Sequence, residues 1–317
     1  MTFPTGSATG GGTAGTVLRI GTRASALAVA QAGTVAERLG AELVTITSEG
    51  DRSTASLASL GGTGVFATAL REALLAGEVD AVVHSYKDLP TTPTPGLTVA
   101  AVPERADARD AVCARDGLTL ATLPAGARVG TGSPRRRAQL AALRPDLVLV
   151  DLRGNVDTRL GRVGLDDPER GLDAVVLAAA GLARLGRLDA ATELLPLETW
   201  PTAAAQGALA VETRAGEEHR VEALDHRPSR LAAEAERGVL ARLEAGCAAP
   251  VGAHAVVRDG ALHLSATVYR PDGTDRLTRA ATADATDPRG PVDLAERVAA
   301  GLLAAGAADL AALGPSA

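Results

Sequence analysis

Residues 130–162 read GTGSPRRRAQLAALRPDLVLVDLRGNVDTRLGR, and this stretch decides the fold class. A short apolar run, ARVGTG (127–132), leads into an arginine-bearing helical segment, and a second run, DLVLV (146–150), leads into another. Ser133-Pro134 is typical of a helix start, because serine is a favoured N-cap and proline a favoured first helical residue. Short apolar strands that alternate with helices predict an α/β protein with a parallel sheet.

Seven arginines lie between Arg135 and Arg162 in a chain whose net charge is −6. Arginine is the ordinary basic residue here, with 31 Arg to one Lys, so charge count alone favours solvated surface side chains. Their placement favours a site instead, because ligands of open α/β sheets bind at the carboxyl ends of strands and anions bind at helix N-termini. Guanidinium groups match carboxylate or phosphate oxygens two at a time. We therefore predict a site for an anion with several acid groups.

Composition narrows the class of protein. A chain of 317 residues with 46% hydrophobic residues can form two or three domains with proper cores. A pI near 5.5 and few aromatics argue against nucleic acid as the main partner. Two cysteines, 134 positions apart, fit neither a disulfide framework nor a metal motif, so we expect a reducing compartment and no metal. We expect residues 1–16 to be a flexible tail without a secretory signal, and the protein to be cytoplasmic with no membrane span.

Strand-like and helical patterns alternate through the first two thirds of the chain. This alternation predicts α/β structure from residue 17 to about residue 225. The polar, glycine-rich residues 48–64 predict a mobile loop over a site. Expected elements are strands at 17–21, 42–47, 79–85 and 206–214, helices from Ser25 to Gly40, at 66–77 and at about 217–225, and a second strand–helix series from 110 to 200.

The pattern changes after Pro228, which predicts a separate domain at 227–317. A capped amphipathic helix is expected at 229–244, followed by three strand-like runs with turn signals at Asp259-Gly260 and Pro271-Asp272-Gly273. An alanine-rich helix (291–313) closes the chain. The expected domain is α+β, with an antiparallel sheet and helices on one face.

Two further segments are chemical candidates. Cys247 lies in GCAAPVG on a loop, although a lone cysteine is more often a small buried hydrophobe, as we expect of Cys113. HSYKDLP (84–90) places polar groups, including the only lysine, at the end of a buried strand. Asp88 in this segment is equally consistent with a turn-forming residue and with a catalytic one.

Several segments in order and spacing resemble the porphobilinogen deaminase family, also called hydroxymethylbilane synthase. The resemblance covers about residues 17–260, and HSYKDLP, LRGNVDTRL and GCAAPVGAHA are its most specific motifs. It implies two doubly wound α/β domains, resembling those of two-domain periplasmic binding proteins, plus the small C-terminal α+β domain. The first domain would comprise residues 17–105 together with 206–226, and the second would comprise residues 106–205. Other matching segments are RIGTRASALAVAQ, GGTGVFATALREALLAGEVDAVV, ERADARDAV, GTGSPRRRAQL, AAAGLARLG and AAAQGALAVETR.

The resemblance implies a transferase that joins four porphobilinogen units head to tail, releases ammonia each time, and then hydrolyses off the linear tetrapyrrole. Its cofactor is a dipyrromethane held by a thioether bond to a cysteine, which in this chain is Cys247. The catalytic carboxylate falls on Asp88, which would stabilise the positive charge that develops when the amine leaves. Lys87 would keep Asp88 ionised. We expect porphobilinogen as the small-molecule partner, no nucleic acid or membrane, and a monomer.

The same motifs imply which residues bind the acetate and propionate groups of cofactor and substrate. Departures from the family pattern occur at Ser59 and Thr63, where loop lysines are common, and in PTAAAQG, which is one residue longer than usual. Arg137 lies beyond the paired arginines of its motif and is expected to be surface charge. The implied binding residues are Arg23, Ser25, Ser85, Lys87, Thr131, Ser133, Arg135, Arg136, Arg153, Arg159 and Gln206.

Two rival classes of protein would use the same arginines. A non-catalytic two-domain anion-binding protein would carry no covalent adduct at Cys247, and such proteins usually have an export signal. A nucleic-acid module would read phosphates through residues 135–162, but the acidic total charge argues against it.

Overall fold

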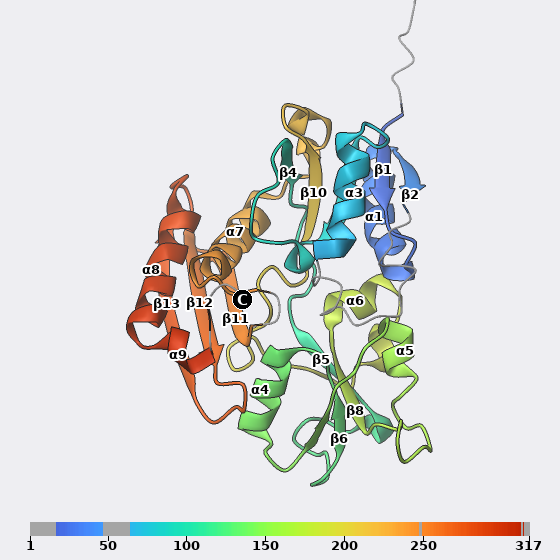
Figure 1. Ribbon diagram of the computed structural model, residues 1–317, viewed down its shortest axis with the longest axis vertical. Coiled ribbons are helices and arrows are strands. Elements are labelled where there is room, and N and C mark those ends of the chain that lie inside the picture. The colour runs from blue at the N-terminus through green and yellow to red at the C-terminus, as the bar shows by residue number, and fades with distance from the viewer. Residues whose placement is uncertain (1–16, 47–63, 247–248, 312, 314–317) are drawn as a thin grey trace, which may run out of the picture.

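The computed structural model describes residues 17–46, 64–246, 249–311 and 313, and its elements form three units, each built on one sheet (Figure 1). The predicted tail (1–16), most of the predicted loop (48–64) and Cys247 lie outside the described residues. Among the helices of the described ranges, none combines the length and apolar character that crossing a membrane requires. The expected fold class, two α/β units plus a small unit with an antiparallel sheet, is confirmed.

The first unit has a five-stranded sheet of order β2-β1-β3-β10-β4. The strand β10 runs antiparallel to both of its neighbours and comes from far along the chain, so the chain returns to this sheet after building the second one. The hydroxyl of Ser25 caps the first helix and Gly40 ends it in a left-handed conformation, as the sequence predicts. The elements are β1 (Arg19–Thr22), α1 (Ala26–Leu39), β2 (Glu42–Thr45), α3 (Gly64–Leu75), β3 (Ala81–Ser85), β4 (Leu97–Ala101) and β10 (Leu209–Arg214).

The second unit has a sheet of order β7-β6-β8-β5-β9. Ser133 caps α4 with Pro134 in its first turn, and Asn155 caps α5, so both arginine clusters do lie where a strand leads into a helix. The elements are β5 (Asp110–Ala114), β6 (Arg128–Gly130), α4 (Pro134–Leu143), β7 (Val148–Val150), α5 (Val156–Leu160), β8 (Ala174–Ala178), α6 (Ala179–Arg184) and β9 (Glu193–Leu194).

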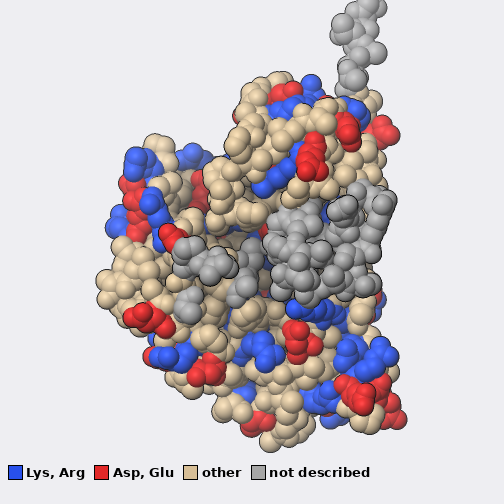
Figure 2. Space-filling view, in the orientation of Figure 1, with Lys and Arg blue, Asp and Glu red and all other residues tan. Residues whose placement is uncertain are grey.

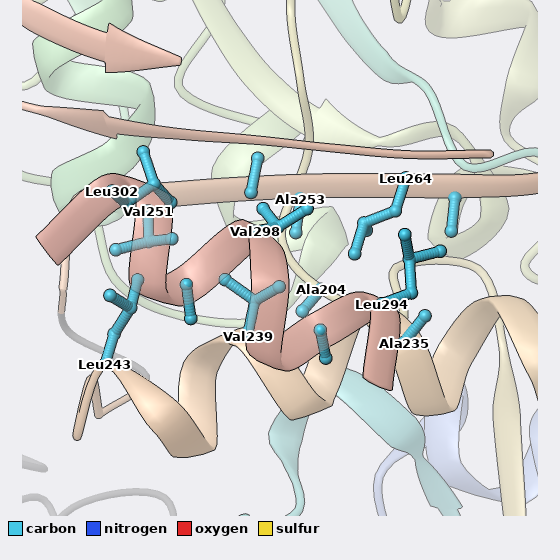
Figure 3. Close-up of a cluster of buried hydrophobic side chains, with 14 of the residues drawn as sticks. Ala204, Ala235, Val239, Leu243, Val251, Ala253, Leu264, Leu294, Val298 and Leu302 are labelled. Carbon is cyan, nitrogen blue, oxygen red and sulfur yellow. The ribbon is translucent and has the colours of Figure 1, made fainter. Parts of the chain in front are cut away.

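The third unit places helices on one face of an antiparallel sheet of order β11-β12-β13. Its core is aliphatic, and Figure 3 shows Val239 and Leu243 of α7 together with Leu294, Val298 and Leu302 of α8, packed beneath the sheet. The elements are α7 (Arg227–Arg242), β11 (Val251–Arg258), β12 (Ala261–Tyr269), β13 (Arg276–Asp284), α8 (Gly290–Ala304) and α9 (Ala307–Ala311).

Two predicted helices differ from the structure. The helix expected at 217–225 is a pair of short 3-10 turns, Glu218–Arg220 (η4) and Glu222–Leu224 (η5), because this segment is too short to propagate an α-helix after Gly216. The helix expected at 291–313 is divided into α8 and α9. Gly306 has φ +94°, which no α-helical residue adopts, and this conformation ends the first helix.

Glu236 of α7 joins all three units at one point. Its fully buried carboxylate accepts hydrogen bonds from Arg105 (2.6 and 3.0 Å) and from the backbone N–H groups of Ala205 (2.5 Å) and Ala255 (2.6 Å). Arg105 and Ala205 lie on the two chain segments that connect the first and second units, whereas Ala255 lies in β11. One buried carboxylate therefore fixes both connections against the third unit.

Glu212 of β10 anchors α3 to the strand that carries the HSYKDLP motif. Arg71 donates two hydrogen bonds to the buried Glu212 carboxylate (2.9 and 2.7 Å), and His84 Nε2 lies 3.1 Å from it. Burial alone would raise the pKa of Glu212, but His84 and Arg71 lower it to about 2.

We expect this depressed pKa to contribute about 3 kcal/mol to the free energy of unfolding at neutral pH. Because the folded pKa lies below the unfolded value of 4.5, the contribution is complete above that value and is lost as the pH falls toward 2. Urea unfolding of the wild type and of Glu212→Gln from pH 6 to pH 3 measures it. The free energy of unfolding of the variant should fall less than that of the wild type over this range. An equal dependence on pH in the two proteins would contradict the depressed pKa of Glu212.

Candidate active site

The segment HSYKDLP forms the end of β3 and a short 3-10 turn, Tyr86–Asp88 (η1). The side chains of Tyr86 and Leu89 are buried and anchor the turn on either side, and the Tyr86 N–H donates to Ala208 of the connection before β10 (3.0 Å). Between these anchors, Lys87 is half-buried and Asp88 is exposed. The local fold therefore presents Lys87 and Asp88 in the turn at the end of β3.

Lys87 connects this turn to the boundary between the first two units. Its ammonium lies 3.5 Å from the side-chain oxygen of Gln206, a buried residue that donates to Asp110 (2.8 Å) and to the carbonyl of Ala108 (2.8 Å). Burial lowers the pKa of Lys87, Asp88 raises it, and Arg136 lowers it. The charges of both units therefore act on the Lys87 ammonium.

Arg135 and Arg136 lie at the start of α4 and share one buried carboxylate, Asp110. Arg135 donates to it at 2.9 Å, and Arg136 donates from two nitrogens at 2.6 and 3.1 Å. Trp200 Nε1 adds a further hydrogen bond at 2.8 Å. Burial would raise the pKa of Asp110, but the two arginines hold it far below its usual range. The two guanidinium groups are thus held in place by the protein itself.

Asp110→Asn is expected to lower the free energy of unfolding by about 3 to 5 kcal/mol, because it leaves two buried arginines without a compensating charge. Urea denaturation followed by circular dichroism measures this loss. Asp146→Asn is the matched control, since Asp146 pairs with Arg144 at the surface and its substitution should have little effect on stability. Equal effects of the two substitutions would contradict the role of Asp110.

Arg159 of α5 lies within electrostatic reach of the same turn. Its Nε donates to the carbonyl of Gly154 (2.7 Å). Burial and Arg136 lower the pKa of Arg159, whereas Asp151 and Asp88 raise it. Asp88 of the first unit and Arg159 of the second unit are therefore close enough to influence each other electrostatically.

Other predicted site residues surround this group less closely. Arg153 is exposed and its Nε lies 3.5 Å from Asp151, and Arg23 is half-buried directly after β1. The hydroxyls of Ser25 and Ser133 accept backbone N–H groups as helix caps, and that of Thr131 accepts the N–H of Ser133. Arg137, expected at the surface, is half-buried, and its guanidinium lies 3.5 Å from the Leu149 carbonyl.

Several contributing residues were missed by the sequence reasoning. Gln31 donates to Ser85 (2.8 Å), and Arg184 donates to the carbonyl of Gly207 (2.7 Å), with burial lowering the Arg184 pKa. Asp110 and Glu236 were also overlooked. A signal existed for two of them, because Gln31 is a polar residue on the apolar face of its helix and Asp110 opens a buried strand.

A separate cavity of about 850 Å³ lies between the end of α4 and the outer face of the third sheet. Its lining includes Leu143, His254, His263 and Tyr269 but none of the predicted site residues. This cavity is therefore distinct from the group of predicted site residues.

The fold defines an α/β protein of two doubly wound units with a small antiparallel unit, in which paired arginines lie at a strand-to-helix junction. Residues 18–222 match the family described as "Porphobilinogen deaminase, dipyromethane cofactor binding domain", and residues 230–304 match "Porphobilinogen deaminase, C-terminal domain". The chain belongs to the porphobilinogen deaminase family. It is therefore a transferase with a dipyrromethane cofactor, and the rival non-catalytic interpretation is not favoured.

Curated relatives agree with this assignment over most of the chain. The porphobilinogen deaminase of Leifsonia xyli is 60% identical over 93% of this chain and 94% of its own length, and that of Thermobifida fusca is 55% identical over 86% and 87%. Among solved structures, an arginine periplasmic binding protein from Legionella pneumophila covers 65% of this chain and 91% of its own, at 14% identity and a TM-score of 0.34. A likeness this distant adds nothing to the functional assignment.

Proposed function

We propose that this enzyme condenses four porphobilinogen units head to tail onto a dipyrromethane attached to Cys247, releases ammonia at each step, and hydrolyses off the linear tetrapyrrole. One observation supports the proposed location of this reaction, between the first and second units. The Lys87–Asp88 turn of the first unit shares an electrostatic environment with Arg136 and Arg159 of the second.

The charges around this turn fit the cofactor that the family uses. Each pyrrole of a dipyrromethane carries an acetate and a propionate, so the group is a polyanion. Among the described residues of this group, four cations (Lys87, Arg135, Arg136, Arg159) are accompanied by three carboxylates (Asp88, Asp110, Asp151), which leaves an excess of one positive charge. When bound, the cofactor supplies the pyrrole carbon to which the first substrate is joined.

Asp88 is the proposed catalytic residue. Its carboxylate is exposed at the site and stabilises the positive charge that develops on a substrate pyrrole as the amine departs. Lys87 pairs with a ligand acid group in this proposal. The residues proposed to bind acid groups, either by direct contact or through a fixed charge, are Arg23, Ser25, Ser85, Lys87, Thr131, Ser133, Arg135, Arg136, Arg153, Arg159 and Gln206.

Arg135 and Arg136 act mainly as a fixed source of positive charge in this proposal. Both are anchored to Asp110 and to backbone carbonyls, so they need no reorganisation when an acid group arrives. Every added substrate brings two further acid groups, and this fixed positive potential stabilises them as the chain grows.

We further propose the division of the chain into domains at 17–105 with 206–226, at 106–205 and at 227–317. The proposed molecule is a monomer in the cytoplasm that does not bind nucleic acid. Figure 2 supports the last point, because basic and acidic side chains are interspersed on the face that it shows. Sedimentation equilibrium at micromolar concentration tests the monomer.

Product stoichiometry tests the proposed reaction. The purified enzyme is incubated with porphobilinogen, and ammonia and linear tetrapyrrole are quantified in the same samples. The proposal requires four ammonia released for each tetrapyrrole, whereas porphobilinogen binding without ammonia release would support the anion-binding alternative.

A further inference from the structure

Arg237 of α7 reaches from the third unit to the turn that carries Asp88. Its guanidinium donates to the backbone carbonyls of Tyr86 (2.9 Å), Leu89 (2.9 Å) and Pro90 (2.7 Å). It also lies over the Tyr86 ring, 4.5 Å from the ring centroid. Figure 1 shows α7 between the third sheet and the β4–β10 edge of the first. One side chain of the third unit therefore binds the backbone on both sides of Lys87 and Asp88.

The turn has few internal bonds that could fix its shape. The hydrogen bond that closes it, from the Leu89 N–H to the Tyr86 carbonyl, is long at 3.4 Å. Pro90, which follows, has no N–H to donate. Hydrogen bonds from a charged donor are stronger than those between neutral groups. The three bonds from Arg237 therefore define the backbone conformation that places the Asp88 carboxylate.

Arg230 makes a matching contact seven residues earlier on the same helix. It donates to the carbonyls of Val99 (3.2 Å) and Ala100 (2.8 Å) in β4 and pairs with Asp225. These contacts also attach the third unit to the first unit, but they involve the regular strand β4, which begins nine residues after Asp88, and not the turn itself. Substitution of Arg230 therefore measures how much a contact between the third and first units contributes to stability, without a change in the turn that carries Asp88.

We propose that Arg237 is a positioning residue for the reaction, acting through the turn on Asp88. It contacts neither substrate nor cofactor in this role. Its effect is on the chemical step, because it sets the geometry of the carboxylate and leaves the basic binding groups unchanged. The inference rests on the proposed catalytic role of Asp88.

The test compares the holoenzymes of the wild type, Arg237→Met, Arg237→Lys and Arg230→Met. Intact-protein mass spectrometry gives the fraction loaded with cofactor, and kcat and KM for porphobilinogen are expressed per loaded molecule. The pH dependence of kcat and the thermal midpoint are measured for each. Methionine keeps the apolar stem of arginine and removes the forked donor.

Arg237→Met should lower kcat by about 10- to 100-fold with KM changed by less than about threefold, because a displacement of about 1 Å in a catalytic group has effects of this size. Its pH profile for kcat should shift. Arg237→Lys should recover part of the rate, since an ammonium can donate to the same carbonyls. Arg230→Met should lose thermal stability with kcat within about twofold of the wild type.

A kcat for loaded Arg237→Met within about twofold of the wild type would overturn the inference. So would a rate loss in Arg230→Met that equals that of Arg237→Met at similar thermal midpoints. If Arg237→Met does not fold, the test depends on Arg237→Lys. An Arg237→Lys enzyme with the kcat and pH profile of the wild type would then overturn the positioning role of Arg237. An active wild type in these assays separates failure of this inference from failure of the proposed function.

Discussion

Asp88→Asn should reduce kcat by about 10²- to 10⁴-fold while the protein folds normally. Asparagine has almost the same shape but cannot stabilise developing positive charge as a carboxylate does, and general acid–base or electrostatic groups of this kind contribute effects of this size. Because Asp88 is exposed, the substitution buries no unsatisfied group and should leave the thermal midpoint nearly unchanged. Single-turnover and steady-state consumption of porphobilinogen by holoenzyme measure the change.

Asp116→Asn is the matched control for this substitution. Asp116 is also an exposed aspartate in a short turn, it pairs only at the surface with Arg115, and its φ of 57° is one that asparagine tolerates. Its kcat should stay within about twofold of the wild type. If Asp88→Asn retained the same activity as Asp116→Asn, the catalytic carboxylate would have to be sought elsewhere.

Cys247→Ser should abolish covalent attachment of the cofactor and, with it, tetrapyrrole synthesis. A thiolate is a much stronger carbon nucleophile than a serine hydroxyl, and a thioether resists hydrolysis, so only the cysteine provides a lasting anchor. Intact-protein mass spectrometry of natively purified samples should show the wild type heavier than its bare chain by a dipyrromethane, and the variant at the mass of the bare chain.

Cys113 provides the control for the thiol chemistry. It is buried in β5 with 2% of its surface exposed, and burial raises its pKa to about 11, so little thiolate forms at neutral pH. Cys113→Ala should therefore keep the mass increment and the activity, at a modest cost in stability. An active wild type that has the mass of the bare chain, or an increment that follows Cys113, contradicts attachment at Cys247.

Local signals in the sequence were sufficient to predict several helix starts and turns. Ser25, Ser133 and Asn155 cap helices, because short polar side chains satisfy the first N–H groups of a helix whatever surrounds it. The turn at Asp259-Gly260 forms as predicted with positive φ at both residues. Such features depend on neighbours within a few positions, which the sequence displays directly.

The partners of the charged groups were not predictable in the same way. The sequence placed Arg135 and Arg136 at a helix N-terminus, but it did not indicate that both bind Asp110, 25 and 26 positions earlier. Glu236 meets Arg105 across 131 positions. A buried carboxylate and a solvated one look alike in a sequence, because burial depends on how distant segments pack.

The sequence by itself determined the alternation of strands and helices, the two arginine clusters at strand-to-helix junctions, and the motifs that resemble one enzyme family. These follow from periodicity and from short-range hydrogen bonding, which neighbouring residues fix. Only the tertiary structure decided that Asp110 binds the paired arginines, that Glu236 binds segments of all three units, and that Arg237 donates hydrogen bonds to the turn of Asp88. Those contacts form between segments far apart in the chain, and they exist only once the sheets have packed and water has been excluded from the charges.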